Sequence, residues 1–394
     1  MIVARFRSDV PIDDRSRLTC AWHGRGYRSL QCLAGRHTLV TFPDLEATSP
    51  KGAEFVALLQ ATPALEWVVD SVDAPALGSL AATGEPTAVR VSDDCVVGGG
   101  RFTWIAGPCA VESAAQLLGV AREVRDRGAH LLRGGAFKPR TSPYAFQGLG
   151  KAGLDLLREA SAETGLGVVT EVVDVAHVEA VAEVAQVLQI GARNAQNFAL
   201  LHEVALTGRP VLLKRGFGCT VPEWLHGAEY LLAAGNGNVL LCERGVRTHG
   251  NTTRFTLDIS AVPLAKRLSH LPVIVDPSHA CGRSDLVAPL AAAAAAAGAD
   301  GVMVDVDRAG HSALCDGEQA ITPDAFGALV ERTNRMLRSL DPAPDPAPDP
   351  ARDGRPPTPG SRTTTATGSL PPRVHAPRNA GDNVAGLERR TDPL

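Results

Sequence analysis

The middle of the chain alternates between short apolar runs and longer amphipathic stretches. Each run is short and apolar enough for a strand buried on both faces. The eight runs are residues 103–105, 131–132, 168–169, 187–188, 210–213, 239–241, 272–275 and 302–304. A helix-length stretch separates consecutive runs, for example residues 114–127 and 154–164. Eight repeats of a strand followed by a helix predict an α/β fold, the (β/α)8 TIM barrel.

Polar side chains follow these runs closely. They are Cys109, Arg133, Glu171, Arg193, Lys214, Glu243 with Arg244, Asp276 with His279, and Asp305. In a (β/α)8 barrel the active site is built from the C-terminal ends of the strands and the loops that follow them. The pattern therefore predicts an enzyme with its site at that end of the barrel.

The segments on either side of the barrel differ from it in composition. Residues 1–98 predict strands at 2–6, 29–33, 38–41 and 65–72 and helices at 12–22 and 53–59, the βαββαβ order of a ferredoxin-like α+β domain. Residues 99–340 have the length of one barrel, about 250 residues. Residues 341–394 are rich in proline and poor in large apolar side chains, so we expect a disordered tail there.

Charge and composition limit the expected partners. The net charge is −4 and the pI about 6.3, which favours neither nucleic acid nor an anionic membrane as a partner. The sequence has neither an apolar stretch of about 20 residues nor a signal-peptide pattern, so we expect a cytoplasmic protein. The eight cysteines form no CxxC pair, which favours reduced thiols.

Several cations are predicted to converge on the active-site end. The loop after the second run contains Arg133, Lys138 and Arg140 together with the hydroxyl of Thr141, and other loops add Arg193, Lys214 and Arg244. Like charges gathered at one face repel one another unless an anion neutralises them. The sequence therefore predicts a ligand that carries phosphate or several carboxylates.

A second set of residues has the chemistry of a metal site. Cys109, His279, Asp305 and Asp316 follow the first, seventh and eighth runs, and a thiolate, an imidazole and carboxylates together suit Mn, Fe, Co or Zn. Four other cysteines near the same rim, Cys219, Cys242, Cys281 and Cys315, are expected to pack as small side chains.

Longer motifs carry a family resemblance. The strings AGPCAVES, RGGAFKPRTSPYAFQGLG, TEVVD, QIGARNAQNF, LLKRG, LCERGVRT, LDISAVP, DPSHACGR and GADGVM run in order through the barrel region. In these strings the chain resembles the type I beta class of 3-deoxy-D-arabino-heptulosonate 7-phosphate (DAHP) synthases. The resemblance implies a transferase that condenses phosphoenolpyruvate, erythrose 4-phosphate and water to DAHP and phosphate. That reaction is the first step of the shikimate pathway of aromatic amino acid biosynthesis.

The resemblance also implies roles for single residues. Cys109, His279, Asp305 and Asp316 would hold a divalent metal ion, and Arg193 and Arg244 would bind the phosphate of phosphoenolpyruvate. Arg133, Lys138 and Lys214 would surround its carboxylate, while Arg140 and Thr141 would bind the aldose phosphate. Asp276 joins the expected substrate-binding residues, and the expected catalytic residues are Cys109, Lys138, Glu171 and His279, with Glu171 orienting water or moving a proton.

The sequence departs from this family at the eighth run. Asp305-Val306-Asp307 stands where the family usually has Glu-Val-His, so the metal and its ligands stay open, with Asp307 as a further possible ligand. One alternative function is condensation with arabinose 5-phosphate, as in 3-deoxy-D-manno-octulosonate 8-phosphate synthases. A catalytically silent regulatory barrel is another. The family also implies a homotetramer or homodimer, and an aromatic amino acid as effector of the N-terminal domain.

Overall fold

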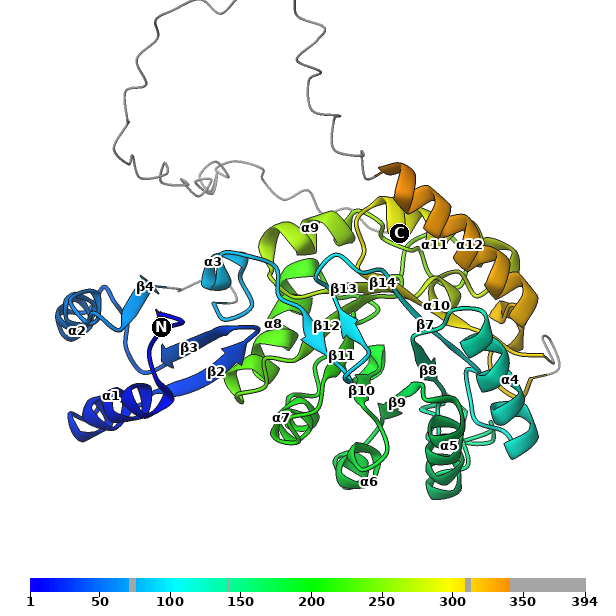
Figure 1. The fold of residues 1–394 in the computed structure, drawn as a ribbon, viewed down its shortest axis with the longest axis horizontal. Helices are drawn as coiled ribbons and strands as arrows, with labels where there is room; N and C mark the ends of the chain where they lie inside the picture. The colour runs from blue at the N-terminus through cyan, green and yellow to red at the C-terminus, as the bar shows by residue number, and fades with distance from the viewer. Residues whose placement is uncertain (71–75, 141, 309–312, 341–394) are drawn as a thin grey trace, which may run out of the picture. The chain divides into compact units, whose positions relative to one another are not determined.

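The computed structural model describes residues 1–70, 76–140, 142–308 and 313–340, which form an N-terminal sheet and a closed barrel (Figure 1). Three expectations from the sequence fall wholly or partly outside these ranges. They concern the end of the fourth predicted strand, the substrate-binding role of Thr141, and the tail at 341–394.

The N-terminal sheet has four antiparallel strands in the order β2-β3-β1-β4. Its elements are β1 (Ile2–Phe6), α1 (Ile12–Gly24), β2 (Leu30–Ala34), β3 (His37–Phe42), α2 (Pro50–Gln60) and β4 (Leu65–Asp70). Aromatic side chains from the sheet and both helices form one core, in which the ring of Trp22 lies 5.3 Å from that of Phe42 and the ring of Phe55 lies 4.8 Å from Phe42. The predicted α+β order is confirmed.

The barrel closes through eight parallel strands. They are β7 (Thr103–Gly107), β8 (Leu131–Arg133), β9 (Gly167–Val172), β10 (Val187–Ile190), β11 (Val211–Lys214), β12 (Val239–Glu243), β13 (Val273–Val275) and β14 (Gly301–Asp305). The helices are α4 (Ala114–Asp126), α5 (Lys151–Thr164), α6 (Val178–Ala182), α7 (Phe198–Leu206), α8 (Val221–Ala233), α9 (Ala261–Leu268), α10 (Pro277–Cys281), α11 (Ser284–Ala296) and α12 (Pro323–Leu340). The predicted TIM barrel is confirmed. None of the helices in the described ranges combines the length and apolar character that a membrane crossing requires.

The period of two along the strands divides their side chains between two cores. Side chains such as Trp104, Leu132 and Leu213 pack outward against the helices. The side chains of the inner core come from all eight strands: Ile105, Leu131, Val169, Val187, Leu212, Leu240 with Cys242, Ile274 and Met303. This inner layer fills the barrel below the site.

A short hairpin closes the floor of the barrel. Strands β5 (Val89–Arg90) and β6 (Val96–Val97) pair with each other, and Val89, Cys95 and Val97 belong to the inner core. The hairpin lies within the 1–98 segment, but its buried side chains complete the barrel. The domain boundary near residue 98 stays a proposal. The packing of the hairpin supports a boundary that lies before the hairpin.

The second face of the N-terminal sheet packs on the outside of the barrel. Val3, Cys32 and Leu39 belong to the same apolar cluster as the barrel helices. The backbone of β2 approaches the loop before β12 so closely that a Cβ on Gly237 would lie 1.5 Å from the carbonyl oxygen of Leu33. Downstream of the sheet, the amides of Leu77 and Gly78 donate to the carboxylate of Glu229 in α8, at 2.7 and 2.9 Å. These contacts join the sheet and the segment after it to the barrel.

Candidate active site

The strand period that builds the inner core also builds the site. The inward position two residues after the inner-core residue of a strand carries a polar side chain in seven strands. These side chains are all buried, and they are Arg133, Glu171, Gln189, Lys214, Arg244, Asp276 and Asp305. Because parallel strands end at the same rim, these side chains come together. Six of these seven side chains are among those that the sequence places after the strands, and Gln189 is the exception.

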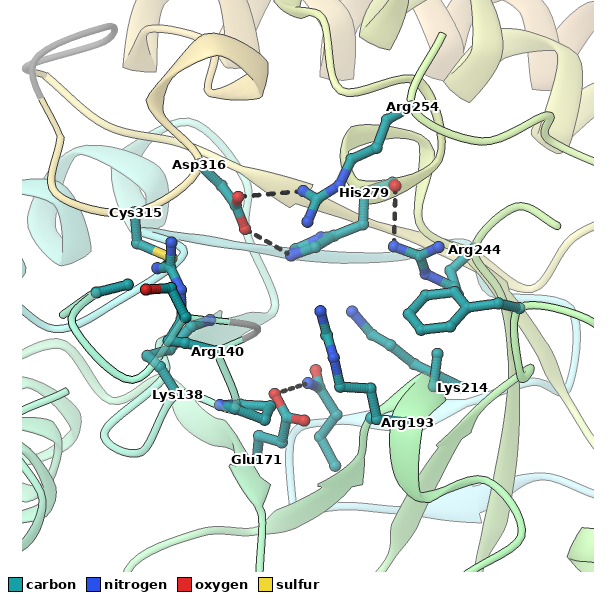
Figure 2. Close-up of a pocket in the computed structure, with 17 residues that line it drawn as sticks. Lys138, Arg140, Glu171, Arg193, Lys214, Arg244, Arg254, His279, Cys315 and Asp316 are labelled. Atoms are coloured by element: carbon teal, nitrogen blue, oxygen red, sulfur yellow. Dashed lines mark hydrogen bonds and ion pairs between the residues drawn. The ribbon is translucent and has the colours of Figure 1, made fainter. Parts of the chain in front are cut away.

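A cavity of about 270 Å³ opens above this ring (Figure 2). Six cations line it among the described residues: Lys138, Arg140, Arg193, Lys214, Arg244 and Arg254. Two carboxylates, those of Glu171 and Asp316, lie in the same lining together with His279. The side chains of Arg193 and Lys214 point toward the imidazole of His279 across the space in Figure 2. The excess of cations suits a ligand with more than one negative charge.

Aromatic rings support two of the arginines. Phe217 and Phe255 stack with their ring centroids 4.8 Å apart, and the guanidinium of Arg244 lies 4.9 and 4.3 Å from them. Arg193 lies over Phe217 at 5.4 Å. Burial lowers the pKa of Arg244 to about 10, and its Nη1 has no hydrogen-bond partner among the described residues. Arg244 is thus a buried cation with a free donor, as an anion site requires.

Two other cations are already paired with carboxylates beneath the cavity. Lys214 Nζ lies 2.5 Å from Asp276 Oδ2, and Arg133 Nη1 lies 2.5 Å from Asp305 Oδ1. Lys214 still lines the cavity, whereas Arg133 and Asp276 do not. The structure therefore places these two predicted substrate-binding residues one layer below the cavity, where they hold their neighbours in position.

Glu171 reaches the cavity because Gly191, the residue that follows β10, has no side chain. A Cβ on Gly191 would lie 2.0 Å from Glu171 Oε1, so only glycine leaves room for the carboxylate. Gln189 Nε2 donates to the other oxygen, Oε2, at 3.4 Å. The predicted catalytic carboxylate is thus held at the cavity wall.

Three predicted metal ligands lie together at one side of the cavity. Cys109 Sγ is 3.7 Å from His279 Nε2 and 3.2 Å from Asp316 Oδ2, and the last two atoms are 3.8 Å apart. A thiol, an imidazole and a carboxylate at these separations have the donor chemistry and the spacing of a transition-metal site. Lys138 Nζ lies 3.1 Å from the same sulfur.

Neighbouring charges tune this cluster. Burial alone would lower the pKa of His279, but the carboxylates of Asp276 and Asp305 raise it above its ordinary value. Asp276 Oδ2 lies 2.9 Å from Nδ1 as an ion pair, which favours a proton on that nitrogen and leaves Nε2 facing Cys109. Burial alone would raise the pKa of Asp316, but His279 and Arg254 hold it well below its ordinary value.

Cys315 packs in a small buried cluster with Cys109 and Ala110, as expected of a small side chain, but it also contacts the predicted metal ligands. Its sulfur lies 3.7 Å from Cys109 Sγ, and Arg140 Nη1 donates to it at 2.8 Å. The hydrogen bond between the two sulfurs raises the pKa of Cys109 and lowers that of Cys315, which Lys138 and Arg140 lower further. Cys315 lines the cavity, and the next residue, Asp316, takes a left-handed conformation with φ 55°.

Asp305 and Asp307 occupy different surroundings. Asp305 accepts from Arg133 through Oδ1 and from Gln319 Nε2 through Oδ2, the latter at 2.5 Å. Asp307 accepts from Gln116 Nε2 at 2.7 Å, on the side of α4, and does not line the cavity. Strand β14 ends at Asp305, so the alternation of side chains does not carry Asp307 back to the site.

Sequence reasoning also missed two cavity residues that lie outside strand ends. Arg254 reaches Asp316 Oδ1 at 3.1 Å from a long loop, and Phe217 supports the arginines. Neither position has a periodic signal, because loop residues are placed by the path of the loop.

Comparison with known proteins identifies the family. The profile of the DAHP synthetase I family matches residues 86–339. This chain belongs to the DAHP synthetase I family. The phospho-2-dehydro-3-deoxyheptonate aldolase of Thermotoga maritima is 51% identical over 247 residues, which are 63% of this chain and 73% of that protein. A 2-dehydro-3-deoxyphosphooctonate aldolase of Syntrophotalea carbinolica is 31% identical over 274 residues, 65% of this chain and 96% of that protein.

Solved structures give the same result for the DAHP synthetase I fold. The crystal structure of the Thermotoga maritima phospho-2-dehydro-3-deoxyheptonate aldolase (DAHP synthase) superposes with a TM-score of 0.67 at 39% identity, covering 86% of this chain and 98% of that one. A truncated form of that synthase gives 0.63 at 46% identity, covering 67% of this chain and 97% of the other. The first match extends beyond the barrel, because it covers more of the chain than the family profile does.

Proposed function

We propose that this protein is a DAHP synthase, which joins phosphoenolpyruvate, erythrose 4-phosphate and water to give DAHP and inorganic phosphate. The observation that carries the proposal is the cavity, in which six cations face a cluster of metal-ligating side chains. The 51% identity to the heptonate enzyme, against 31% to the octonate enzyme, supports erythrose 4-phosphate as the aldose.

The cations divide into two groups that fit two anionic substrates. Arg193 and Arg244, supported by Phe217, are suited to the phosphate of phosphoenolpyruvate, and Lys138 and Lys214 to its carboxylate. Arg140, with Thr141, is assigned to the phosphate of the aldose. Two anions held side by side by fixed cations react as if at high effective concentration, and the cations offset their mutual repulsion.

A divalent metal ion fits the residues present, and Cys109, His279 and Asp316 would hold it. When bound, such an ion supplies a Lewis acid for the aldehyde oxygen of the aldose. The mixed sulfur, nitrogen and oxygen donors favour Mn, Fe, Co or Zn. Glu171 lines the cavity and would orient the water that adds to the former phosphoenolpyruvate carbon or accept its proton, while Lys138 lies against Cys109 and would link the two parts of the site.

The substrate assignment can be tested directly. Phosphate release from phosphoenolpyruvate is measured with erythrose 4-phosphate and with arabinose 5-phosphate, before and after treatment with a chelator and after metal is restored. We expect much faster release with erythrose 4-phosphate and its loss on chelation. A preference for the pentose would assign the protein to octulosonate synthesis, and no turnover with either sugar would support the silent barrel.

We also propose that the N-terminal domain is regulatory, with an aromatic amino acid as its effector, and that the protein is a homotetramer or homodimer. The apolar contact between the sheet and the barrel supports the regulatory role, because a conformational change caused by an effector on the sheet can be transmitted to the barrel through these packed side chains. Light scattering and inhibition assays with phenylalanine, tyrosine and tryptophan test these two proposals.

A further inference from the structure

Two overlapping groups of side chains could each hold a metal ion, and they share Cys109. One contains Cys315 and Asp316, and the other contains His279 and Asp305; within each group the ligand atoms lie within 4.8 Å of one another. The choice between Cys315 and Asp305 decides whether the site has one thiolate or two.

Asp305 is already engaged on both of its oxygens. Oδ1 accepts from Arg133 and Oδ2 from Gln319, each at 2.5 Å, and the side chain is fully buried. Binding a metal through Oδ2 would displace the amide of Gln319. Binding it through Oδ1 would separate Arg133 from its carboxylate and leave a buried cation unpaired, which is strongly unfavourable.

Asp305 also lies on the less suitable side of the histidine. The ring nitrogen that it approaches is Nδ1, at 3.6 Å, and this nitrogen already faces Asp276 at 2.9 Å. The other nitrogen, Nε2, faces Cys109 and Asp316. A metal bound at Nε2 therefore meets the donors around Cys109, whereas the carboxylate of Asp305 approaches the other nitrogen of the ring.

Cys315 is placed where a further donor would be needed. Its sulfur is 3.7 Å from that of Cys109, and donors in a tetrahedral site with bonds of about 2.3 Å to sulfur are separated by about 3.8 Å. Lys138 and Arg140 lie 3.1 and 2.8 Å from the two sulfurs, so cations are present to balance a pair of thiolates.

We propose that Cys315, and not Asp305, joins Cys109, His279 and Asp316 as a metal ligand in this chain. Each thiol releases its proton to solvent when it binds, and the site then presents two sulfurs, one nitrogen and one oxygen. Such a donor set favours zinc and cobalt over manganese, because thiolate is a soft ligand. Asp305, whose side chain is shorter than the glutamate that the family usually has there, remains bound to Arg133.

The inference rests on the proposed function only for the presence of a metal, and its test needs no substrate. Reduced full-length protein is titrated with Co²⁺, and the sulfur-to-cobalt charge-transfer absorption is recorded for the wild type and for Cys315→Ala, Asp305→Asn and Cys95→Ala. Cys95 lies in the floor of the barrel and serves as the matched buried cysteine. Unfolding curves of each variant establish that it is folded.

We expect Cys315→Ala to lose about half of the absorption per bound Co²⁺ and to bind the ion at least about tenfold more weakly. Asp305→Asn and Cys95→Ala should keep the full absorption. In an independent measurement on the wild type, bound Co²⁺ should protect two thiols from a thiol reagent. One protected thiol, or loss of binding in Asp305→Asn with full absorption in Cys315→Ala, would overturn the proposal, whatever the condensation assay gives.

Discussion

Arg133 and Asp305 form an ion pair beneath the cavity, with 2.5 Å between Nη1 and Oδ1 and side chains that are 3% and 0% exposed. Arg133 Nη1 also donates to the carbonyl oxygen of Pro108 at 3.0 Å. The pair joins the ends of β8 and β14, on either side of β7 in the barrel. The ion pair therefore holds in place the rim from which Cys109 projects, and it stabilises the site from below.

The first prediction concerns the stability of this pair. Removing one partner leaves a buried charge, so Asp305→Ala should lower the free energy of unfolding of the metal-free protein by about 3–5 kcal/mol. The double variant Arg133→Met with Asp305→Leu should lose less than Asp305→Ala, because no charge remains unpaired. Denaturant unfolding of the metal-free forms measures both effects. A double variant that loses as much stability as Asp305→Ala, or more, would show that the two groups do not act as a pair.

The second prediction concerns the arginines over Phe217. Arg193→Ala removes the proposed partner of the phosphoenolpyruvate phosphate, and a charged hydrogen bond contributes about 1.5–3 kcal/mol, so KM for phosphoenolpyruvate should rise about tenfold or more. Arg193→Lys should recover only part of the lost affinity for phosphoenolpyruvate, because lysine cannot donate in the same planar geometry. Steady-state kinetics measure the change, with exposed Arg267→Ala on α9 as the control. An unchanged KM in Arg193→Ala would place the phosphate elsewhere.

The strand ends were predictable because the chemistry follows a fixed period. Arg133, Glu171, Lys214 and Asp276 each lie two residues after an inner apolar residue, and that spacing is visible in the sequence. The predicted metal ligands came from the donor chemistry at the strand ends, and the family resemblance implied the same four residues. What the sequence does not reveal is which predicted residues bind each other. Arg133 at the end of β8 pairs with Asp305 at the end of β14, two strands away, and nothing local indicates that contact.

Residues on loops escaped prediction for a different reason. Cys315 resembles any other small cysteine in the sequence, and nothing local indicates that its loop brings it to the cavity wall. The hairpin around Val89 and Val97 was missed because two-residue strands have no detectable period, and its place in the barrel floor depends on all eight strands. Both features are set by tertiary contacts.

The third prediction concerns the boundary of the N-terminal domain. A chain that begins at Ala76 keeps the hairpin and the bonds from Leu77 and Gly78 to Glu229, so it should fold and catalyse condensation. It should also lose any inhibition by an aromatic amino acid. A chain that begins at Gly99 lacks Val89, Cys95 and Val97, and it should be strongly destabilised because the inner core is then open to water.

Thermal unfolding and phosphate release compare the two truncated chains with the full-length protein. Stable, active protein from Gly99 onward would show that the hairpin is dispensable. Inhibition that survives in the chain from Ala76 would place the effector on the barrel.

The last prediction concerns His270, which joins the segment after the N-terminal sheet to the barrel. Its Nε2 lies 2.8 Å from the carbonyl oxygen of Leu77 and its Nδ1 lies 2.9 Å from Thr87 Oγ1. Burial lowers the pKa of this histidine from 6.5 to about 4, with the hydrogen bond to Leu77 opposing the change. The folded protein therefore holds His270 neutral at a pH where the unfolded chain already binds a proton.

The sign of the pH effect follows from that difference. The stability is fully present above pH 6.5 and is lost as the pH falls toward 4, by about 3–4 kcal/mol if each pKa unit contributes about 1.4 kcal/mol. His270→Gln keeps an amide donor for Leu77 but cannot titrate, so its free energy of unfolding should fall less between pH 7 and pH 4.5 than that of the wild type. Urea unfolding at the two pH values measures the difference. Parallel losses in both proteins would mean that His270 is protonated without cost in the folded state, and that carboxylates elsewhere set the acid sensitivity.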